Sequence, residues 1–237
     1  MGRGLMRRFW KINNAGSICV PIVETTMENA LRAVEEGKRL ADLIELRVDY
    51  LRGAELERLL KAGKKPLIVT NRRKAEGGRY RGDEKKRLAV LRQAVDLGAA
   101  FVDVEMRTER SSLRELIKNK NGTRMILSSH DFQRTCSGGE LRKLLDRMMR
   151  QGADVAKIAT FARSWDDNLK VLALIPYARK RGQAIVTFCM GEKGKMSRIF
   201  SPLMGAAWTY ASLSRKQASA PGQLTVKEMR EIWERLE

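Results

Sequence analysis

Short runs of apolar and β-branched residues alternate along this chain with longer stretches in which apolar residues recur every three or four positions. Eight of the short runs are candidate strands. Several are almost continuously apolar, which is typical of parallel strands covered on both faces. The candidates are Ser17–Val23, Leu43–Val48, Pro66–Thr70, Phe101–Glu105, Arg124–Ser128, Asp154–Ala159, Ala184–Met190 and the less regular Ala206–Tyr210.

The longer stretches have the spacing of helices with one buried face. This spacing occurs at Leu141, Leu144, Leu145, Met148 and Met149, and again at Val226, Met229, Trp233 and Leu236. A Ser or Thr three residues before a Glu predicts a helix start with a capping box. Such pairs are Thr25 and Glu28, Ser112 and Glu115, Ser137 and Glu140, and Thr225 and Glu228.

Eight strand–helix units without a Pro/Gly/Ser-rich linker predict an α/β fold of the (β/α)8 type, a TIM barrel. We expect a single barrel domain over residues 17–237, preceded by a basic N-terminal extension over residues 1–16. The alternative is a doubly wound open sheet, which normally has a glycine-rich phosphate turn after its first strand. Here that strand is followed by Glu24-Thr25-Thr26. In a barrel, chemistry takes place at the C-terminal ends of the strands.

The chain carries 47 basic and 28 acidic residues, a formal net charge of +19. Such a charge is compatible with nucleic-acid binding. The basic residues, however, are spread over nearly every predicted helix, and no RNA-binding aromatic motif, zinc finger or helix-turn-helix is present. We therefore expect a solvated basic surface that attracts an anionic small-molecule substrate, with no nucleic-acid partner.

The three cysteines are dispersed and odd in number, which predicts reduced thiols in a cytoplasmic protein. No apolar run approaches the roughly 18 residues of a membrane helix. The N-terminal segment lacks the long apolar core and cleavage site of a signal peptide. We therefore expect no membrane association.

The second candidate strand alternates polar and apolar residues. Glu45, Arg47 and Asp49 share one face by the two-residue period of a strand, and Ile44, Leu46 and Val48 share the other. An exposed edge strand could alternate in this way. Inside a parallel barrel the polar face must point into the lumen, where charges are costly unless they are paired or bind substrate. This pattern predicts a functional polar cluster.

The single histidine and one lysine lie at two successive apolar runs. His130 follows the run that begins at Arg124, and Lys157 lies inside Asp154–Ala159. A lysine among apolar strand residues is uncommon, because burial disfavours the ammonium and exposes the nucleophilic lone pair. The alternative is a lysine that snorkels to the surface. An amine and an imidazole in one cavity suit chemistry on a ketone: the amine condenses with it and the imidazole moves protons.

Other polar residues follow the third and seventh candidate strands. Arg72 and Glu76-Gly77-Gly78 belong either to a flexible basic loop or to an anion-binding arm hinged at the two glycines, with Glu76 holding its partners. Phe188 and Met190 are either ordinary core residues or the apolar walls of a site.

Two segments near the C-terminus suit a carboxylate. Arg198 opens a predicted helix, where a guanidinium and free backbone donors act together. The segment Ser219-Ala-Pro-Gly-Gln223 is either a plain connection or a lid whose amides and side chains close over a polar ligand. One histidine and dispersed cysteines leave no zinc or iron constellation, so no metal is expected. A Ser-His-Asp hydrolase is disfavoured because no nucleophile elbow is present.

Taken together, these motifs resemble the type I 3-dehydroquinate dehydratases, Schiff-base enzymes of the shikimate pathway of aromatic amino acid biosynthesis. The resemblance runs from Cys19 to about Gln223. It rests on Glu45-Leu-Arg47-Val-Asp49, Arg72 with Glu76-Gly-Gly, Ser129-His130-Asp131-Phe132, Asp154-Val-Ala-Lys157-Ile, Met190-Gly with Ser197-Arg198, and Ser219-Ala-Pro-Gly-Gln223. It implies a (β/α)8 lyase, often a homodimer, that uses no metal or organic cofactor.

The resemblance also implies roles for individual residues. Lys157 would form an imine with the C-3 ketone of 3-dehydroquinate, His130 would act as acid and base, and Glu76 would orient His130. The substrate-binding residues would be Glu45, Arg47 and Arg72 on the ring hydroxyls, Phe188 and Met190 as walls, and Arg198, Ser219 and Gln223 on the carboxylate. Two alternatives stay open: another Schiff-base enzyme of the aldolase type, and a basic nucleic-acid-binding protein.

Overall fold

Eight parallel strands form the centre of the molecule. The computed structural model describes residues 16–63 and 65–236. Each strand pairs with the next along the chain from β1 to β7, and β1 also pairs with β8. The strands are β1 Ile18–Ile22, β2 Leu43–Arg47, β3 Leu67–Thr70, β4 Phe101–Glu105, β5 Arg124–His130, β6 Val155–Phe161, β7 Ala184–Met190 and β8 Thr209–Tyr210.

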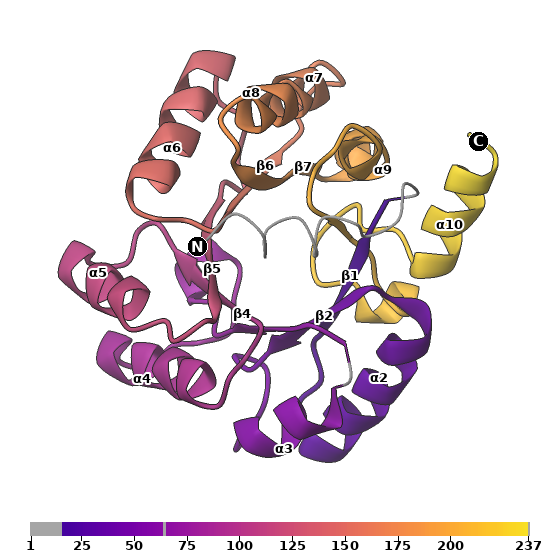
Figure 1. Ribbon diagram of the computed structural model, residues 1–237. Helices are drawn as coiled ribbons and strands as arrows, with labels where there is room; N and C mark the ends of the chain where they lie inside the picture. Colours follow the sequence, from indigo (N-terminus) through magenta and orange to yellow (C-terminus); the bar gives the residue numbers. More distant parts are fainter. Residues whose placement is uncertain (1–15, 64, 237) are drawn as a thin grey trace.

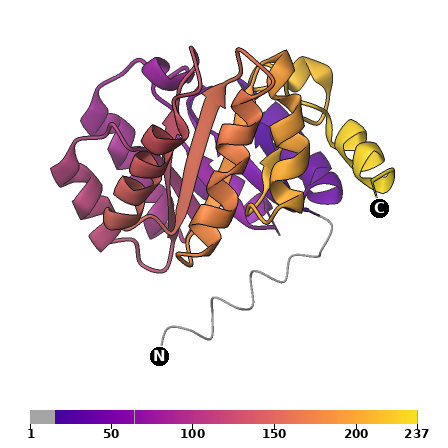
Figure 2. The ribbon, with the colours of Figure 1, turned by 90° about the horizontal axis from the view of Figure 1, so that it is seen from above.

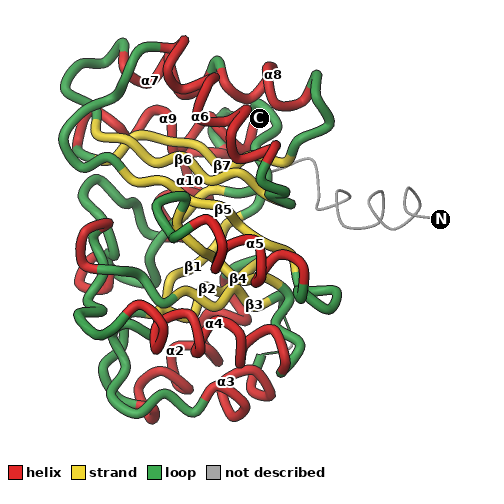
Figure 3. Tube along the Cα trace, turned by 90° about the vertical axis from the view of Figure 1, so that its left-hand side faces the viewer, coloured by secondary structure: helices red, strands yellow, loops and turns green. Residues whose placement is uncertain are grey.

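Helices surround this ring of strands (Figure 1). Seen from the side, they run alongside the strands (Figure 2), and the loops gather at the two ends of the strands (Figure 3). The helices are α2 Met27–Leu40, α3 Leu56–Ala62, α4 Glu84–Asp96, α5 Arg110–Lys118, α6 Gly138–Arg150, α7 Asp167–Leu172, α8 Leu174–Arg179, α9 Lys195–Leu203 and α10 Val226–Glu234.

The predicted (β/α)8 barrel is confirmed, and the doubly wound sheet is wrong. The strands follow one another in consecutive order, with β8 beside β1. The barrel is nearly closed: β7 and β8 form no ladder, but the amide of Ala207 donates to the carbonyl of Ile185 at 2.7 Å. The last predicted strand, Ala206–Tyr210, is shorter than expected, because only Thr209 and Tyr210 pair with β1.

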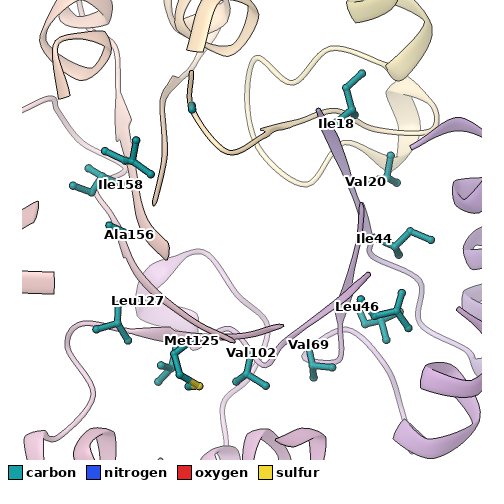
Figure 4. Close-up of a cluster of buried hydrophobic side chains, with 14 of the residues drawn as sticks. Ile18, Val20, Ile44, Leu46, Val69, Val102, Met125, Leu127, Ala156 and Ile158 are labelled. Atoms are coloured by element: carbon teal, nitrogen blue, oxygen red, sulfur yellow. The ribbon is translucent and has the colours of Figure 1, made fainter. Parts of the chain in front are cut away.

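The alternation of side chains along the strands separates two cores. Outward-facing apolar residues such as Ile44, Leu46 and Ile158 point away from the barrel axis and pack under the helices (Figure 4). Inward-facing apolar residues form a second cluster that includes Phe101, Val186 and Trp208. Burial of both faces explains why most strands read as continuous apolar runs. The inward polar residues of β2 are therefore exceptions that need another explanation.

Two of the four predicted capping boxes are present and two are wrong. Ser137 caps α6 and Thr225 caps α10, each with the predicted glutamate in return. For α2 the cap is Thr26, one residue later than predicted. For α5 it is Glu109, whose carboxylate accepts from the amides of Ser111 and Ser112, so the helix begins earlier than predicted.

The helix face predicted on α6 is buried or half-buried, as expected. The face predicted for α10 is buried at Val226, Met229 and Trp233, but Leu236 is exposed because the helix ends at Glu234. The predicted basic extension lies outside the described residues except for Gly16. Within the described part of the chain, no helix is long and apolar enough to cross a membrane.

Candidate active site

A pocket opens at the C-terminal ends of the barrel strands, with about 470 Å³ of empty space that is partly open to solvent. It brings together every residue that the sequence singled out as catalytic or substrate-binding: Glu45, Arg47, Arg72, Glu76, His130, Lys157, Phe188, Met190, Arg198, Ser219 and Gln223. Gly77, Phe132, Ala159, Tyr210 and Ala220 complete the lining. Residues up to 178 positions apart in sequence therefore meet because parallel strands end at one rim.

Lys157 belongs to a ring of four polar side chains, one from each even-numbered strand. Its Nζ donates to Glu45 Oε1 at 3.2 Å, to Asp103 Oδ2 at 3.0 Å and to Tyr210 Oη at 3.0 Å. Barrel interiors are filled by layers of side chains from alternate strands. Here one of those layers is polar, and the pocket lies above it.

This ring corrects one expectation about Lys157. The strand around the lysine is apolar, and Ala156 and Ile158 do point outward into the core (Figure 4). The amine itself, however, lies between two carboxylates and is not in apolar surroundings. The side chain is only 5% exposed, so those carboxylates offset the cost of burying the ammonium. The alternative of a snorkelling lysine is wrong.

Asp103 connects Lys157 to a second cation, Arg72. The guanidinium of Arg72 pairs with Asp103 at 2.7 Å and with Glu105 at 3.1 Å, and it donates to Ser128 Oγ at 2.7 Å. Burial alone would raise the pKa of Asp103, but Arg72 and Lys157 outweigh that effect and hold its pKa well below the usual range. Asp103 is therefore an anion fixed between two cations.

His130 and Glu76 form the second reactive group of the pocket. Glu76 Oε2 lies 3.1 Å from His130 Nδ1 and also accepts from the backbone amide of His130 at 3.1 Å. Burial raises the pKa of Glu76 to about 7, a rise that Glu105 and Asp103 reinforce and Arg72 opposes. Burial also lowers the pKa of His130 well below its ordinary value, and Arg72 and Lys157 lower it further. At neutral pH the imidazole is therefore uncharged.

Two glycines explain how Glu76 reaches His130. Glu76 ends a short 3-10 turn, and Gly77 then has φ 78°, a conformation that favours glycine. A Cβ at Gly77 would lie 2.2 Å from the ring of Phe132, and one at Gly78 would lie 1.9 Å from the carbonyl oxygen of Arg72. Both glycines are therefore required for close packing of this loop against β5 and the end of β3.

Arg47 and Asp49 do not share the role that their spacing predicted. Strand β2 ends at Arg47, and Asp49 lies in the turn that follows, outside the pocket lining. The Asp49 carboxylate accepts from Arg47 Nε at 2.9 Å and from Arg47 Nη2 at 2.8 Å, and from the amide of Arg79 at 2.9 Å. Asp49 therefore fixes the Arg47 side chain at the rim and attaches the Glu76 loop to β2.

One wall of the pocket contains donors without partners among the described residues. Arg198 is buried, its guanidinium carbon lies 4.3 Å from the centre of the Phe188 ring, and burial lowers its pKa to about 10. Its Nε has no hydrogen-bond partner within the described residues, and neither does Nε2 of Gln223. The helix α9 begins at Lys195, so Arg198 is its fourth residue and does not open it as predicted.

The segment from Ser219 to Gln223 lies against the end of β7. The amide of Gly191 donates to the carbonyl of Pro221 at 3.0 Å, and Arg198 Nη2 reaches the same oxygen at 3.4 Å. A Cβ at Gly222 would lie 2.2 Å from the carbonyl oxygen of Gly191. Gln223 Oε1 accepts from the amide of Ser219 at 2.7 Å, which closes the segment on itself. Ser219, Ala220 and Gln223 of this segment therefore form part of the pocket lining.

The sequence reasoning missed Asp103, Glu105 and Ser128. Asp103 and Glu105 share the period-two alternation that drew attention to Glu45, in the run Phe101-Val-Asp103-Val-Glu105. The same alternation therefore indicates polar residues on the lumen face of β4. Within the described residues, no group of three or more His, Cys, Asp or Glu side chains is arranged to hold a metal ion. The three cysteines are free.

Comparison with known proteins adds independent information. A family model described as type I 3-dehydroquinase matches residues 18–237. The chain is 37% identical over 220 residues to the 3-dehydroquinate dehydratase of Methanocaldococcus jannaschii, which covers 91% of this chain and 97% of that protein. It is 38% identical over 223 residues to the 3-dehydroquinate dehydratase of Desulfotalea psychrophila, at 92% and 97% coverage.

Solved structures give the same result. The type I 3-dehydroquinate dehydratase of Clostridium difficile, determined with covalently modified comenic acid, superposes with a TM-score of 0.85 at 28% identity, covering 93% of this chain and 92% of that one. The 3-dehydroquinate dehydratase of Enterococcus faecalis gives a TM-score of 0.82 at 30% identity, with 94% of each chain covered. A 3-hexulose-6-phosphate synthase, at 16% identity and a TM-score of 0.58, shares the fold alone.

Proposed function

The chain belongs to the type I 3-dehydroquinase family, a family of lyases, and we propose that it dehydrates 3-dehydroquinate to 3-dehydroshikimate through an imine on Lys157. Membership of the family implies a place in the shikimate pathway. The observation that carries the proposed mechanism is the meeting, in one pocket, of a buried lysine held by two carboxylates and a neutral histidine held by a glutamate.

The surroundings of Lys157 suit an imine. Once a proton of the Lys157 ammonium has passed to the ketone oxygen and the amine has attacked the carbonyl carbon, that oxygen leaves as water. The product is a protonated imine that carries the same single positive charge as the ammonium it replaces. Glu45 and Asp103 lie 3.2 and 3.0 Å from the amine and would offset either cation. The protonated imine withdraws electrons from the neighbouring carbon, so its C-2 proton is more easily removed.

His130 would remove that proton. Its pKa lies well below the ordinary value, so the imidazole is neutral and has a free lone pair. When Glu76 is ionised, its carboxylate accepts a hydrogen bond from Nδ1–H of His130, which leaves Nε2 as the base. When Glu76 is protonated, it can donate to Nδ1 instead, and Nε2 then carries the proton. Glu76 would therefore act by fixing the tautomer of His130.

The same imidazole would complete the elimination. The C-2 proton passes to Nε2 of His130, the electron pair of the C–H bond forms the new double bond, and the C-1 hydroxyl leaves with that proton as water. Water then hydrolyses the imine, which releases 3-dehydroshikimate and restores Lys157. This sequence uses the amine, the imidazole and water, so it needs no metal or organic cofactor.

The wall around Arg198 would bind the substrate carboxylate. The partnerless donors Arg198 Nε and Gln223 Nε2 suit an anionic acceptor, because a buried donor without a partner is costly. Ser219 would help from the lid. Glu45, Arg47 and Arg72 would bind the ring hydroxyls, and Phe188 and Met190 would form apolar walls.

Three expectations from the sequence stay predictions: a homodimer, a cytoplasmic location and the absence of a nucleic-acid partner. The aldolase alternative is disfavoured, because relatives at 37 and 38% identity are named 3-dehydroquinate dehydratase. The sugar-phosphate enzymes among the structural neighbours, at 13 to 16% identity, share only the fold.

A direct test is conversion of 3-dehydroquinate by the purified chain, with product followed by chromatography. We expect turnover by the wild type, none above background by Lys157→Met, and full turnover by Lys61→Met, which removes a lysine that is 75% exposed. A wild-type chain without turnover would overturn the proposed activity. Turnover by Lys157→Met at the wild-type rate would overturn the imine mechanism and leave the activity standing.

A further inference from the structure

Arg87 is a fully buried arginine that lies outside the barrel, on helix α4. Nη1 donates to Glu105 Oε2 at 2.6 Å and to the carbonyl of Asn71 at 3.0 Å. Nη2 donates to Thr108 Oγ1 at 3.0 Å and to Glu84 at 2.9 Å, and Nε donates to Glu84 at 2.9 Å. All three guanidinium nitrogens therefore donate hydrogen bonds, and the group points from the helix layer toward Glu105 at the C-terminal end of β4.

From Arg87, charges of alternating sign lead to the reactive amine. Glu105 accepts from Arg87 through Oε2 and pairs with Arg72 through Oε1 at 3.1 Å. Arg72 pairs with Asp103 at 2.7 Å, and Asp103 pairs with Lys157 at 3.0 Å. Each member of this chain is at most 5% exposed, so water screens these interactions little.

After burial, the nearer members of this chain also shift the pKa values of Glu76 and His130. Glu45 also pairs with Lys157, so the cations Arg87, Arg72 and Lys157 face the carboxylates Glu105, Asp103 and Glu45. These six charges balance only when Arg87 is included. Among these groups Glu105 and Asp103 raise the pKa of Glu76 and Arg72 lowers it, while Arg72, Lys157 and Arg47 lower that of His130 and Asp103 raises it. The groups facing the pair therefore come from several elements: Arg47 on β2, Arg72 after β3, Asp103 and Glu105 on β4, and Lys157 on β6.

We propose that Arg87 is a positioning residue for the active site. Through Glu105 and Arg72 it fixes Asp103 against Lys157, and its charge balances the negative charge that Glu105 places near Glu76. The proposal deepens the proposed function and rests on it for the kinetic readout. If Arg87 served only to attach α4 to the barrel, its replacement would lower stability without moving the titration of Glu76.

The first test is the pH dependence of kcat/KM for the dehydration. The acidic limb of this profile, where kcat/KM rises with pH, should report the ionisation of Glu76. In Arg87→Met the uncompensated Glu105 charge should move the midpoint of that limb upward by about 0.5 to 1 pH unit. Displacement of Arg72 and Asp103 should lower kcat about 10- to 100-fold. Arg87→Lys should keep the limb in place and lower kcat less. Arg92→Met, on the same helix but in a half-exposed pair with Glu115, should change neither quantity.

Two further variants test the direction of the shift in the acidic limb. The first also keeps the proposal testable if Arg87→Met does not fold. Glu105→Gln removes the charge that Arg87 balances, so its acidic limb should move downward. The double variant Arg87→Met with Glu105→Gln should return the limb toward the wild-type position. Acidic limbs that stay at the wild-type pH in Arg87→Met and Glu105→Gln, or that move in the same direction in both, would overturn the proposal.

A second readout needs no substrate. His130 is the single histidine of the chain, so the imidazole nitrogens of nitrogen-15 histidine-labelled protein give one set of NMR signals. Their shift between pH 5 and 9 should report the titration of Glu76 near pH 7 in the wild type. It should move upward in Arg87→Met and disappear in Glu76→Gln. This result would establish the electrostatic role of Arg87 even if the chain did not act on 3-dehydroquinate, and an unmoved titration would refute it.

Discussion

Replacement of Glu76 by glutamine should make the folded protein more stable at alkaline pH while it impairs the reaction. Glu76 is 2% exposed, and burial raises its pKa from 4.5 to about 7. At about 1.4 kcal/mol per pH unit, that rise corresponds to about 3 kcal/mol of unfavourable free energy in the folded state once the group is ionised. Glutamine keeps an oxygen that can accept from the His130 amide but carries no charge.

The sign of the pH dependence follows from the raised pKa. The unfolded chain releases the proton of Glu76 at about pH 4.5, whereas the folded chain releases it near pH 7. Stability associated with this group is therefore fully present below pH 4.5, falls as pH rises through that window, and is lost above pH 7. The stability advantage of Glu76→Gln over the wild type should grow by about 2.5 kcal/mol between pH 5 and pH 8.

Urea unfolding at pH 5, 6, 7 and 8 measures this difference, with Glu115→Gln as a control for an exposed glutamate. The control should differ from the wild type by a constant amount at every pH. Turnover should fall in Glu76→Gln, because a neutral amide holds the Nδ1 proton of His130 less strongly than a carboxylate does. The same gain in the free energy of unfolding at pH 5 and pH 8, or a variant less stable than the wild type at pH 8, would show that burial does not destabilise the ionised Glu76 carboxylate.

Other predictions concern single contacts of the pocket. His130→Ala should lower turnover by at least about 100-fold yet still allow imine formation at Lys157; unchanged turnover would refute the acid–base role. Arg198→Met should raise KM for 3-dehydroquinate about 10- to 100-fold, and an unchanged KM would place the carboxylate elsewhere. Gly222→Ala should lower kcat/KM, because its Cβ would lie 2.2 Å from a backbone oxygen. Gly53→Ala is the matched control, since it also has a positive φ but no neighbour within 4 Å, and equal activity of the two variants would contradict a seated lid.

The fold could be read from the sequence because its signals are local. Each strand is an apolar run covered on both faces, and several helix ends carry capping residues, as at Ser137 and Thr225. The predicted boundaries differ from the structure where the cap lies elsewhere, as at Glu109, or where strand pairing is shorter, as in β8. The closure of the ring by β1 and β8 depends on pairing between distant segments, which no local pattern encodes.

The candidate site was readable where a polar residue interrupts an apolar strand. Lys157 is such a residue, and Glu45 and Arg47 are others. The environment of the lysine amine was not readable, because Asp103 and Glu45 approach it from strands that are distant in sequence. Arg87 could not be recognised at all, because a charged residue on an amphipathic helix is expected to face solvent.

The central claim is that Lys157 forms an imine with the substrate. Sodium borohydride added together with 3-dehydroquinate reduces an imine to a stable secondary amine, and mass spectrometry of proteolytic fragments then locates the adduct. We expect one substrate-derived adduct on the peptide that contains Lys157, retained in His130→Ala and absent from Lys157→Met. Turnover without any adduct in the wild type, or an adduct on another lysine, would contradict it.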